Sequence, residues 1–282
     1  MTLLEVLQST TGYFKQRNVE SPRLNAEYLL AHVLKVERID LYLEFERTLT
    51  EEELAPLREL VRRRGQGEPL QHLLGTVEFC GHTFICDKRA LIPRPETEEL
   101  VELVQSEIQA ASGGAKSKML DVGTGSGVIA LSLAAKFPKA EVHGIDVSEE
   151  ALALARENAE RLGLTSRVTF FGSDLLTNVS HEYDLIVANL PYVAIAERDS
   201  LLPEVLRDPT VALFAGECGD ELIRDLIAAA PAHLRPGGRL ALEIGIDQAE
   251  GLTALIENAN FYDISARRDF SGVIRFLFGS YG

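Results

Sequence analysis

Tyr183-Asp-Leu-Ile-Val-Ala-Asn-Leu-Pro-Tyr192 is the part of the sequence that says most about the fold. Its apolar run, residues 185–188, does not alternate with polar residues, which indicates a central strand buried on both faces. The polar cluster 189–192 then lies at the carboxyl end of that strand. Because ligands of open α/β sheets bind outside the carboxyl ends of the strands, we expect a binding site here.

The side chains of this cluster suggest a type of chemistry. Asn189 offers a side-chain carbonyl, and Leu190 precedes a proline, which biases it to an extended backbone that can turn its own carbonyl outward. Two such acceptors can hold the two hydrogens of one planar NH2 group, while Tyr192 covers its flat face and Pro191 stiffens the turn. Modification of an amide or aminopurine nitrogen is one interpretation. A simple strand-ending turn is the other, because Asn and Pro are common in turns.

A glycine-rich turn predicts a cofactor site nearby. A strand over 118–122 meets Gly123-Thr-Gly-Ser-Gly127, and a helix is expected over 128–137. The glycines let a ligand approach the backbone where a helix N-terminus offers free N–H groups. The next strand, 141–146, ends in Asp146, which is placed to bond ribose hydroxyls. The spacing is G-x-G-x-G, whereas the fingerprint of NAD-binding proteins is G-x-G-x-x-G. Asp121 precedes the turn, and a carboxylate near the cofactor suits a cationic ligand better than a pyrophosphate. Both features favour S-adenosylmethionine over NAD.

The rest of the second half continues the strand–helix alternation. A third strand over 168–174 has Ser173-Asp174 at its carboxyl end, where an adenine can be met; a helix cap or turn is the alternative reading of that pair. Alternating strands and helices predict a parallel sheet with right-handed crossovers. The further elements expected are a helix over 220–234, a turn at 235–238, a strand over 239–245, and a hairpin of 262–266 and 273–278 whose final strand is antiparallel.

The first 92 residues differ in pattern from the rest. Residues 1–75 predict a small helical domain of four helices. The first lies near the start, and the second follows Ser21-Pro22 and has Leu24, Tyr28 and Leu29 on its apolar face. The third is expected over 38–46, and the fourth after a capping box of Thr50 and Glu53. Residues 76–92 predict a hairpin linker, because 76–84 alternates around Gly81-His82. Residues 93–282 then form the catalytic domain, in which an extended lead-in opens a helix at Glu96 or Thr97. A flexible connection is expected at 112–116.

Composition limits the class of protein. The chain has 282 residues, of which 46% are hydrophobic and 25% charged, as is usual for a soluble globular protein. We expect a cytoplasmic protein, because no apolar run reaches the about 18 residues of a membrane span and no secretory signal is evident. The three cysteines, Cys80, Cys86 and Cys218, lack C-x-x-C spacing, so we expect neither a disulfide framework nor a metal site.

The net charge of −15 is unevenly distributed. Residues 1–75 hold 10 Lys+Arg and 12 Asp+Glu, whereas the other 207 residues hold 18 and 31. Binding to a phosphate backbone depends on Lys and Arg displacing counterions. An acidic catalytic half therefore argues against nucleic acid as a partner.

Taken together, the motifs resemble those of the protein-glutamine N5-methyltransferases that modify class I peptide-chain release factors. The resemblance covers essentially the whole chain. The glycine motif is shared by many methyltransferases, whereas the proline-rich stretch is far more specific. The matching segments are Arg64-Gly-Gln-Gly-Glu-Pro-Leu-Gln71 with Gly75, Ile92-Pro-Arg-Pro-Glu-Thr-Glu98, Leu120-Asp-Val-Gly-Thr-Gly-Ser-Gly127, Asn189-Leu-Pro-Tyr192 and Gly237-Gly-Arg-Leu-Ala-Leu-Glu-Ile-Gly245.

This resemblance implies a class I S-adenosylmethionine-dependent methyltransferase fold, with a seven-stranded, mostly parallel, doubly wound sheet and a small N-terminal helical domain that helps recognise the release factor. Asn189, Pro191 and Tyr192 would be the catalytic cluster, and with Leu190 they would position the glutamine. The implied contacts to S-adenosylmethionine are Gly123, Thr124, Gly125, Ser126, Gly127, Asp146, Asp174, Leu175 and Asn189.

The sequence departs from the family pattern at two positions. The family usually has Asn-Pro-Pro-Tyr, and here Leu190 replaces the first proline. Asn-Leu-Pro-Tyr also resembles the motif of ribosomal RNA adenine dimethyltransferases, which hold an exocyclic NH2 group in the same way. After Ser173-Asp174 the family often has an aromatic residue to pack on adenine, where this chain has Leu175.

Our main hypothesis is S-adenosylmethionine-dependent methylation of the glutamine side-chain amide in the Gly-Gly-Gln motif of class I release factors. The expected partner is the release factor, without direct nucleic acid or membrane binding and with a monomer favoured. An adenine-N6 methyltransferase acting on RNA or DNA is the alternative, although it needs a basic groove. A third hypothesis is a non-catalytic nucleotide-binding or scaffolding protein that retains the fold.

Overall fold

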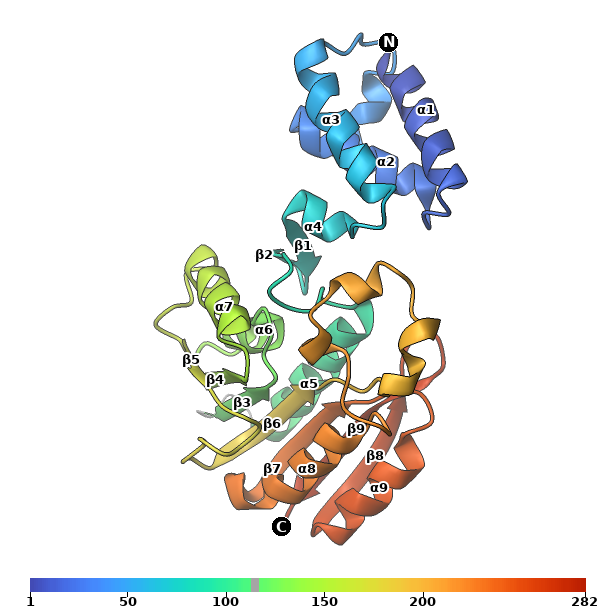
Figure 1. Cartoon of the computed structure of the whole chain (residues 1–282). Coiled ribbons are helices and arrows are strands. Elements are labelled where there is room, and N and C mark those ends of the chain that lie inside the picture. The colour runs from blue at the N-terminus through green and yellow to red at the C-terminus, as the bar shows by residue number, and fades with distance from the viewer. Residues whose placement is uncertain (113–116) are drawn as a thin grey trace. The chain divides into compact units, whose positions relative to one another are not determined.

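The computed structural model describes residues 1–112 and 117–282 (Figure 1). They form two compact units, one of Met1–Thr76 with Leu202–Arg207 and one of Val77–Leu201 with Asp208–Gly282. The connection expected at 112–116 lies, after its first residue, outside the described ranges. Among the described residues, no helix is long and apolar enough to cross a membrane.

The first unit is helical. Helices α1 and α3 both begin with a capping box, from Thr2 with Glu5 and from Thr50 with Glu53. The helix expected over 38–46 is instead a single short 3-10 helix. The helices are α1 (Leu3–Gln16), α2 (Pro22–Leu34), the 3-10 helix Asp40–Leu43, α3 (Glu51–Arg64) and α4 (Leu70–Leu74).

Helix α2 departs from the sequence expectation in two ways. Ser21 precedes it with a left-handed backbone, and its side chain makes no capping hydrogen bond. The buried face is also rotated, because Leu24 and Tyr28 are 38% and 39% exposed while Glu27 is buried. Glu27 tolerates burial because its carboxylate accepts hydrogen bonds from the side chains of Arg23, Arg38 and Tyr42.

The second unit contains a seven-stranded sheet in the order β5-β4-β3-β6-β7-β9-β8, which confirms the expected seven-stranded, mostly parallel sheet. Neighbouring strands among the first five are parallel, and β9 is antiparallel to β7 and to β8, as expected for the terminal hairpin. The turn expected at 235–238 belongs to β7. The strands are β3 (Lys118–Val122), β4 (Glu141–Asp146), β5 (Val168–Gly172), β6 (Tyr183–Asn189), β7 (Leu234–Glu243), β8 (Phe261–Arg268) and β9 (Ile274–Tyr281).

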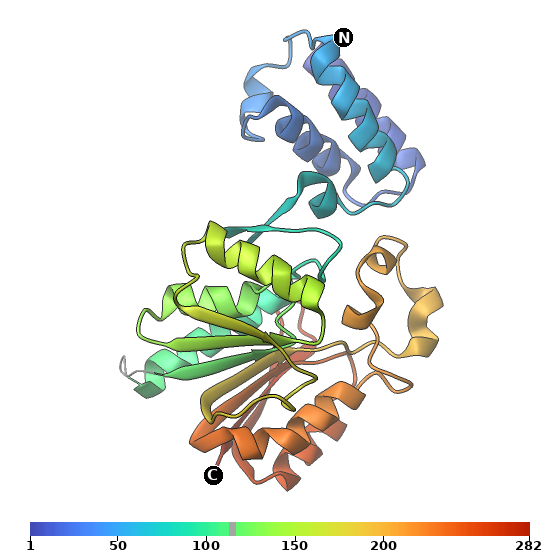
Figure 2. The same cartoon turned by 60° about the vertical axis from the view of Figure 1, so that its left-hand side comes forward.

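Helices cover both faces of this sheet (Figure 2). On β6, Leu185 and Val187 pack toward α5 and α6, and Ile186 and Ala188 pack toward α8 and α9. The non-alternating run therefore is a strand buried on both faces, as its pattern predicted. Helix α5 begins earlier than expected, with Pro95 in its first turn, where a missing N–H costs nothing. The helices are α5 (Pro95–Ser112), α6 (Val128–Lys136), α7 (Glu149–Arg161), α8 (Glu221–Ala229) and α9 (Ala249–Asn258).

Two smaller features complete this unit. The expected hairpin is present as β1 (Thr76–Phe79) and β2 (His82–Ile85). Short 3-10 helices lie between β6 and α8 and directly after α8. These are Ile195–Ser200, Val205–Arg207, Thr210–Ala212 and Ala230–His233, of which Val205–Arg207 belongs to the first unit.

Candidate active site

A cavity of about 330 Å³ lies within the second unit, at the carboxyl ends of β3, β4 and β6. This is the sheet edge at which ligands of α/β folds bind. Of the residues expected in the site, the cavity is lined by Gly123, Thr124, Gly125, Ser126, Asp146, Asp174, Leu175, Asn189, Leu190 and Pro191. Gly127 and Tyr192 are not among its lining residues.

The glycine turn has the backbone conformation that its sequence suggested. Gly125 and Gly127 have φ angles of 54° and 84°, in the left-handed region. A Cβ at Gly127 would lie 3.1 Å from Cβ of Ala155 and from Leu131, so helix packing also requires a glycine there. Gly127 therefore shapes the turn and starts α6 without facing the cavity.

Asp121 lies beneath the turn. Its Oδ2 accepts the Thr124 hydroxyl over 2.6 Å and the Ala130 N–H over 3.1 Å, and the residue is fully buried. Within the described part of the chain, Oδ1 has no hydrogen-bond partner. Burial raises the pKa of this carboxyl to about 7. That Asp121 lies near a cationic cofactor stays a prediction, because Asp121 does not itself line the cavity and ties the glycine turn to the start of α6.

Asp146, by contrast, reaches the cavity. Its Oδ2 accepts the N–H of Gly125 and its Oδ1 the N–H of Ser148, each over 2.9 Å. Burial nevertheless raises its pKa, against these backbone bonds. A carboxylate oxygen has two lone pairs, so Asp146 keeps acceptor capacity for the hydroxyls of a bound sugar.

The loop after β5 forms another wall of the cavity. The Ser173 hydroxyl donates to the carbonyl of Leu175 over 2.7 Å and accepts the N–H of Asn178 over 3.1 Å. Leu175 has a φ of 45°, a conformation that a leucine rarely adopts. Asp174 is exposed at the rim. Leu175 therefore offers an apolar wall where the related sequences often have an aromatic residue.

Asn189 is held by two buried partners. Its Nδ2 donates to Oγ1 of Thr97 over 2.9 Å, and the Thr97 hydroxyl donates to Oε2 of Glu243 over 2.8 Å. Leu190 is buried, and a Cβ built on Gly123 would lie 2.8 Å from its Cδ2, so this side chain packs over the glycine turn. The cluster at the end of β6 and the glycine turn thus share one cavity.

Tyr192 follows Pro191 and is not among the residues that line this cavity. Its ring packs in the cluster on the α8–α9 side, and the guanidinium carbon of Arg275 lies 6.0 Å from the ring centroid. Burial raises the pKa of its hydroxyl to about 12. Its backbone carbonyl accepts Nε2 of Gln248 over 3.1 Å.

The lead-in between β2 and α5 forms one wall of the cavity, and the sequence did not predict it. Arg89, Leu91 and Arg94 from this segment line the cavity, as does Thr97 from the first turn of α5. The specificity of the proline-rich stretch was the available signal, although no residue in it was assigned to the site. Pro209, Val211 and Ala212, from the loop before α8, also line the cavity and carried no signal of their own.

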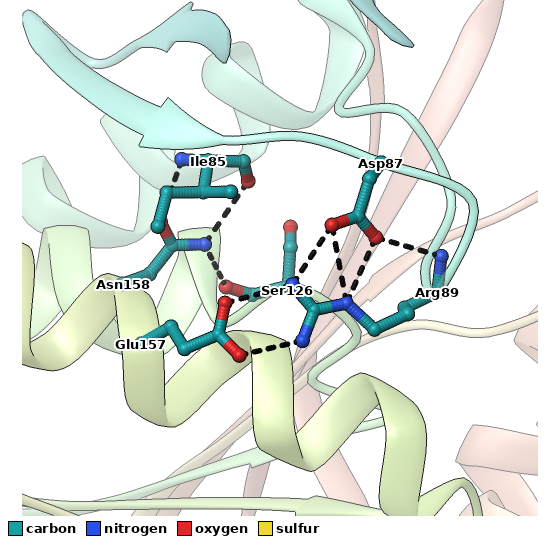
Figure 3. Close-up of polar contacts among 6 residues, drawn as sticks. All are labelled: Ile85, Asp87, Arg89, Ser126, Glu157 and Asn158. Atoms are coloured by element: carbon teal, nitrogen blue, oxygen red, sulfur yellow. Dashed lines mark hydrogen bonds and ion pairs between the residues drawn. The ribbon is translucent and has the colours of Figure 1, made fainter. Parts of the chain in front are cut away.

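Side chains of α7 fix this lead-in (Figure 3). Asn158 accepts the N–H of Ile85 over 2.7 Å and donates to the Ile85 carbonyl over 3.2 Å and to the Ser126 carbonyl over 3.0 Å. The Arg89 guanidinium bonds both Asp87 and Glu157. Asn158 thereby joins the end of β2, where the lead-in begins, to the glycine turn.

Comparisons with known proteins agree with this geometry. A family model described as the PrmC N-terminal domain matches residues 5–75, and one described as the methyltransferase small domain matches 97–217. A release factor glutamine methyltransferase from Geobacter sulfurreducens is 41% identical over 283 residues, covering 100% of this chain and 97% of that protein. A protein of the same name from Chlorobaculum tepidum is 40% identical, covering 98% of this chain and 96% of its own.

Solved structures show the fold. The Thermus thermophilus 16S rRNA N2 G1207 methyltransferase aligns with a TM-score of 0.54 at 20% identity, covering 73% of this chain and 50% of that one. A ribosomal protein L11 methylase from Lactobacillus delbrueckii aligns with a TM-score of 0.50 at 23% identity, covering 66% and 79%. The second unit therefore has the class I methyltransferase fold. With relatives of about 40% identity over their full length, the chain belongs to the release factor glutamine methyltransferase family.

Proposed function

We propose that this chain transfers the methyl group of S-adenosylmethionine to the side-chain amide nitrogen of the glutamine in the Gly-Gly-Gln motif of class I release factors. The observation that carries the proposal is that Asn189 and Leu190 line the same cavity as the glycine turn and Asp146. A cofactor bound along the turn and an amide held at the end of β6 would then meet in one cavity.

The residues present fit the cofactor. The glycine turn offers backbone at close range, Asp146 offers acceptors for two ribose hydroxyls, and Asp174 and Leu175 border the space for an adenine. A cavity of about 330 Å³ is within the usual range for small-molecule sites. When bound, S-adenosylmethionine supplies an electrophilic methyl group on a sulfonium sulfur.

The chain's own contribution is to orient a poor nucleophile. An amide nitrogen has its lone pair delocalised into the carbonyl. Asn189 Oδ1 and the carbonyl of Leu190 would accept its two hydrogens, in a geometry that favours a pyramidal nitrogen with its lone pair aimed at the methyl group. The proton on the amide nitrogen becomes acidic only after the methyl group has been transferred to that nitrogen. No strong base is therefore needed beside Asn189. Pro191 would stiffen this turn, and Tyr192 would cover the flat face of the amide and help to position the glutamine.

A methyl-transfer assay tests the proposal. The purified chain, with radiolabelled S-adenosylmethionine, should label an intact class I release factor and should not label one with Gln→Ala in its Gly-Gly-Gln motif. Labelling of ribosomal RNA in place of the release factor would instead support the adenine-N6 alternative. Residues 76–282 carry net negative charge, which favours the protein substrate over nucleic acid. We also propose that the protein is a cytoplasmic monomer.

We further propose that the helical first unit recognises the release factor. Ile39 and Leu43 are 70% and 82% exposed, and Tyr42 between them is 43% exposed. Neighbouring exposed apolar side chains indicate a protein contact surface. Ile39→Asp with Leu43→Asp should raise KM for intact release factor about tenfold or more and leave transfer to a short Gly-Gly-Gln peptide unchanged. An unchanged KM for the intact protein would contradict this role.

A further inference from the structure

We propose that Thr97 and Glu243 are positioning residues that determine which end of the Asn189 carboxamide faces the reacting amide. This inference rests on the proposed function and adds two residues to it. The three side chains come from separate elements: Thr97 from the first turn of α5, Asn189 from the end of β6 and Glu243 from the end of β7. The β6–β7 register places Asn189 directly beside Glu243.

Few hydrogens are available for bonds among Thr97, Asn189 and Glu243. Thr97 and Glu243 are 3% and 1% exposed, so water does not compete for their bonds. A hydroxyl has one hydrogen, and Thr97 donates it to Glu243 over 2.8 Å. Thr97 Oγ1 can then only accept from Asn189, 2.9 Å away. The NH2 end of the carboxamide must therefore face Thr97, and Oδ1 is left for the cavity that Asn189 lines.

The alternative orientation would defeat the proposed chemistry. The terminal torsion of an asparagine has broad, roughly two-fold preferences, so a free Asn189 side chain can turn over at small cost. The NH2 group of Asn189 would then face the NH2 group of the substrate. Both are hydrogen-bond donors, so no hydrogen bond could form between them. While Glu243 is ionised, the Thr97–Glu243 pair prevents this arrangement, because only one orientation of the carboxamide is then fully bonded.

The protonation state of Glu243 decides which groups donate and which accept in the hydrogen bonds among Glu243, Thr97 and Asn189. Burial raises its pKa to about 7, although Arg275 of β9 favours the charged form. The groups facing it are Thr97 and Glu96 of α5, Asn189 and Tyr192 at the end of β6, and Arg275. An ionised Glu243 only accepts. A protonated Glu243 can donate to Thr97, which can then donate to Asn189 Oδ1 and hold the carboxamide in the unproductive orientation.

Two variants of Thr97 provide the first test, with Thr97→Ser as the matched control that keeps the hydroxyl. Thr97→Val should lower kcat for release factor by about tenfold or more, while S-adenosylmethionine affinity by calorimetry changes less than about threefold. Thr97→Ser should keep kcat within about threefold of the parent. If Thr97→Val keeps the parent kcat, or if Thr97→Ser loses as much as Thr97→Val, the proposal is wrong.

The pH dependence supplies a second readout that a merely structural role would not produce. The parent kcat should rise between about pH 6 and about pH 8, and this rise should be absent in Glu243→Gln, whose side chain does not titrate. The same rise in both proteins would overturn the inference. Failure of the proposed function is distinguishable, since it would appear as labelling by the parent of a release factor that lacks the glutamine.

Discussion

The backbone N–H of Gly125 donates a hydrogen bond to Oδ2 of Asp146 over 2.9 Å, so the end of β4 holds the middle of the glycine turn. One carboxylate thus shapes the turn and lines the cavity beside it. The two roles are compatible because each oxygen can accept more than one hydrogen.

Asp146→Ala removes both the support for Gly125 and the acceptors proposed for the ribose. We expect S-adenosylmethionine to bind more weakly by roughly 1–3 kcal/mol, the cost of leaving a buried polar group unpaired. Isothermal calorimetry measures this change. Glu150→Ala, at an exposed carboxylate on α7, is the control and should bind like the parent. Unchanged affinity in Asp146→Ala would contradict the assignment.

Asn158→Leu should loosen the lead-in segment. The variant leaves three backbone groups, two on the partly buried Ile85 and one on the buried Ser126, without their partner. We expect the free energy of unfolding to fall by at least about 2 kcal/mol and cofactor affinity to fall with it. Denaturant unfolding and calorimetry measure the two effects. Glu160→Ala, on the exposed side of the same helix, should change neither, and a stable Asn158→Leu protein would argue against the clamp.

Asp121 gives a prediction about pH and stability. Burial raises the pKa of this carboxyl from 3.8 to about 7, so folding favours its protonated form. The contribution of Asp121 to the free energy of unfolding is greatest below about pH 3.8 and is lost as the pH rises to about 7. The total change in this contribution is on the order of 4 kcal/mol. Asp121→Asn does not titrate there.

The measurement is the free energy of unfolding of parent and Asp121→Asn across this range. Glu243 shifts in the same direction, so the difference between the two proteins isolates Asp121. We expect the parent to lose stability relative to the variant as the pH rises. A constant difference would show that Asp121 titrates normally.

Local patterns predicted the parts of the fold that depend on local physics. The unbroken apolar run of β6 indicated a doubly buried strand, and the missing helix before β9 indicated the antiparallel end of the sheet. The face of α2 was predicted wrongly, because periodicity cannot show that partners allow Glu27 to be buried. The 3-10 helix at 40–43 likewise replaced a longer helix that only its apolar spacing suggested.

Positions of the site were predictable where a motif ends a strand. Asn189 and Asp146 were placed by that rule alone, and both line the cavity. The bond from Thr97 to Glu243 spans 146 positions, and the bond between Ile85 and Asn158 spans 73. Such pairs leave no periodic signal, so the lead-in wall required the tertiary structure. The bond that Asp121 accepts from the Ala130 N–H, at the start of α6, likewise left no signal in the sequence.

The central claim is that Asn189 and the carbonyl of Leu190 hold the two hydrogens of a glutamine amide. Single-turnover methylation of a class I release factor by the folded Asn189→Ala variant tests it most directly. The rate should fall about 10²-fold or more, as when one preorganised electrostatic partner is lost, with a smaller effect on cofactor binding. Leu190→Pro should stay within about tenfold of the parent, because its acceptor is main-chain. Transfer by Asn189→Ala at the parent rate would contradict the account.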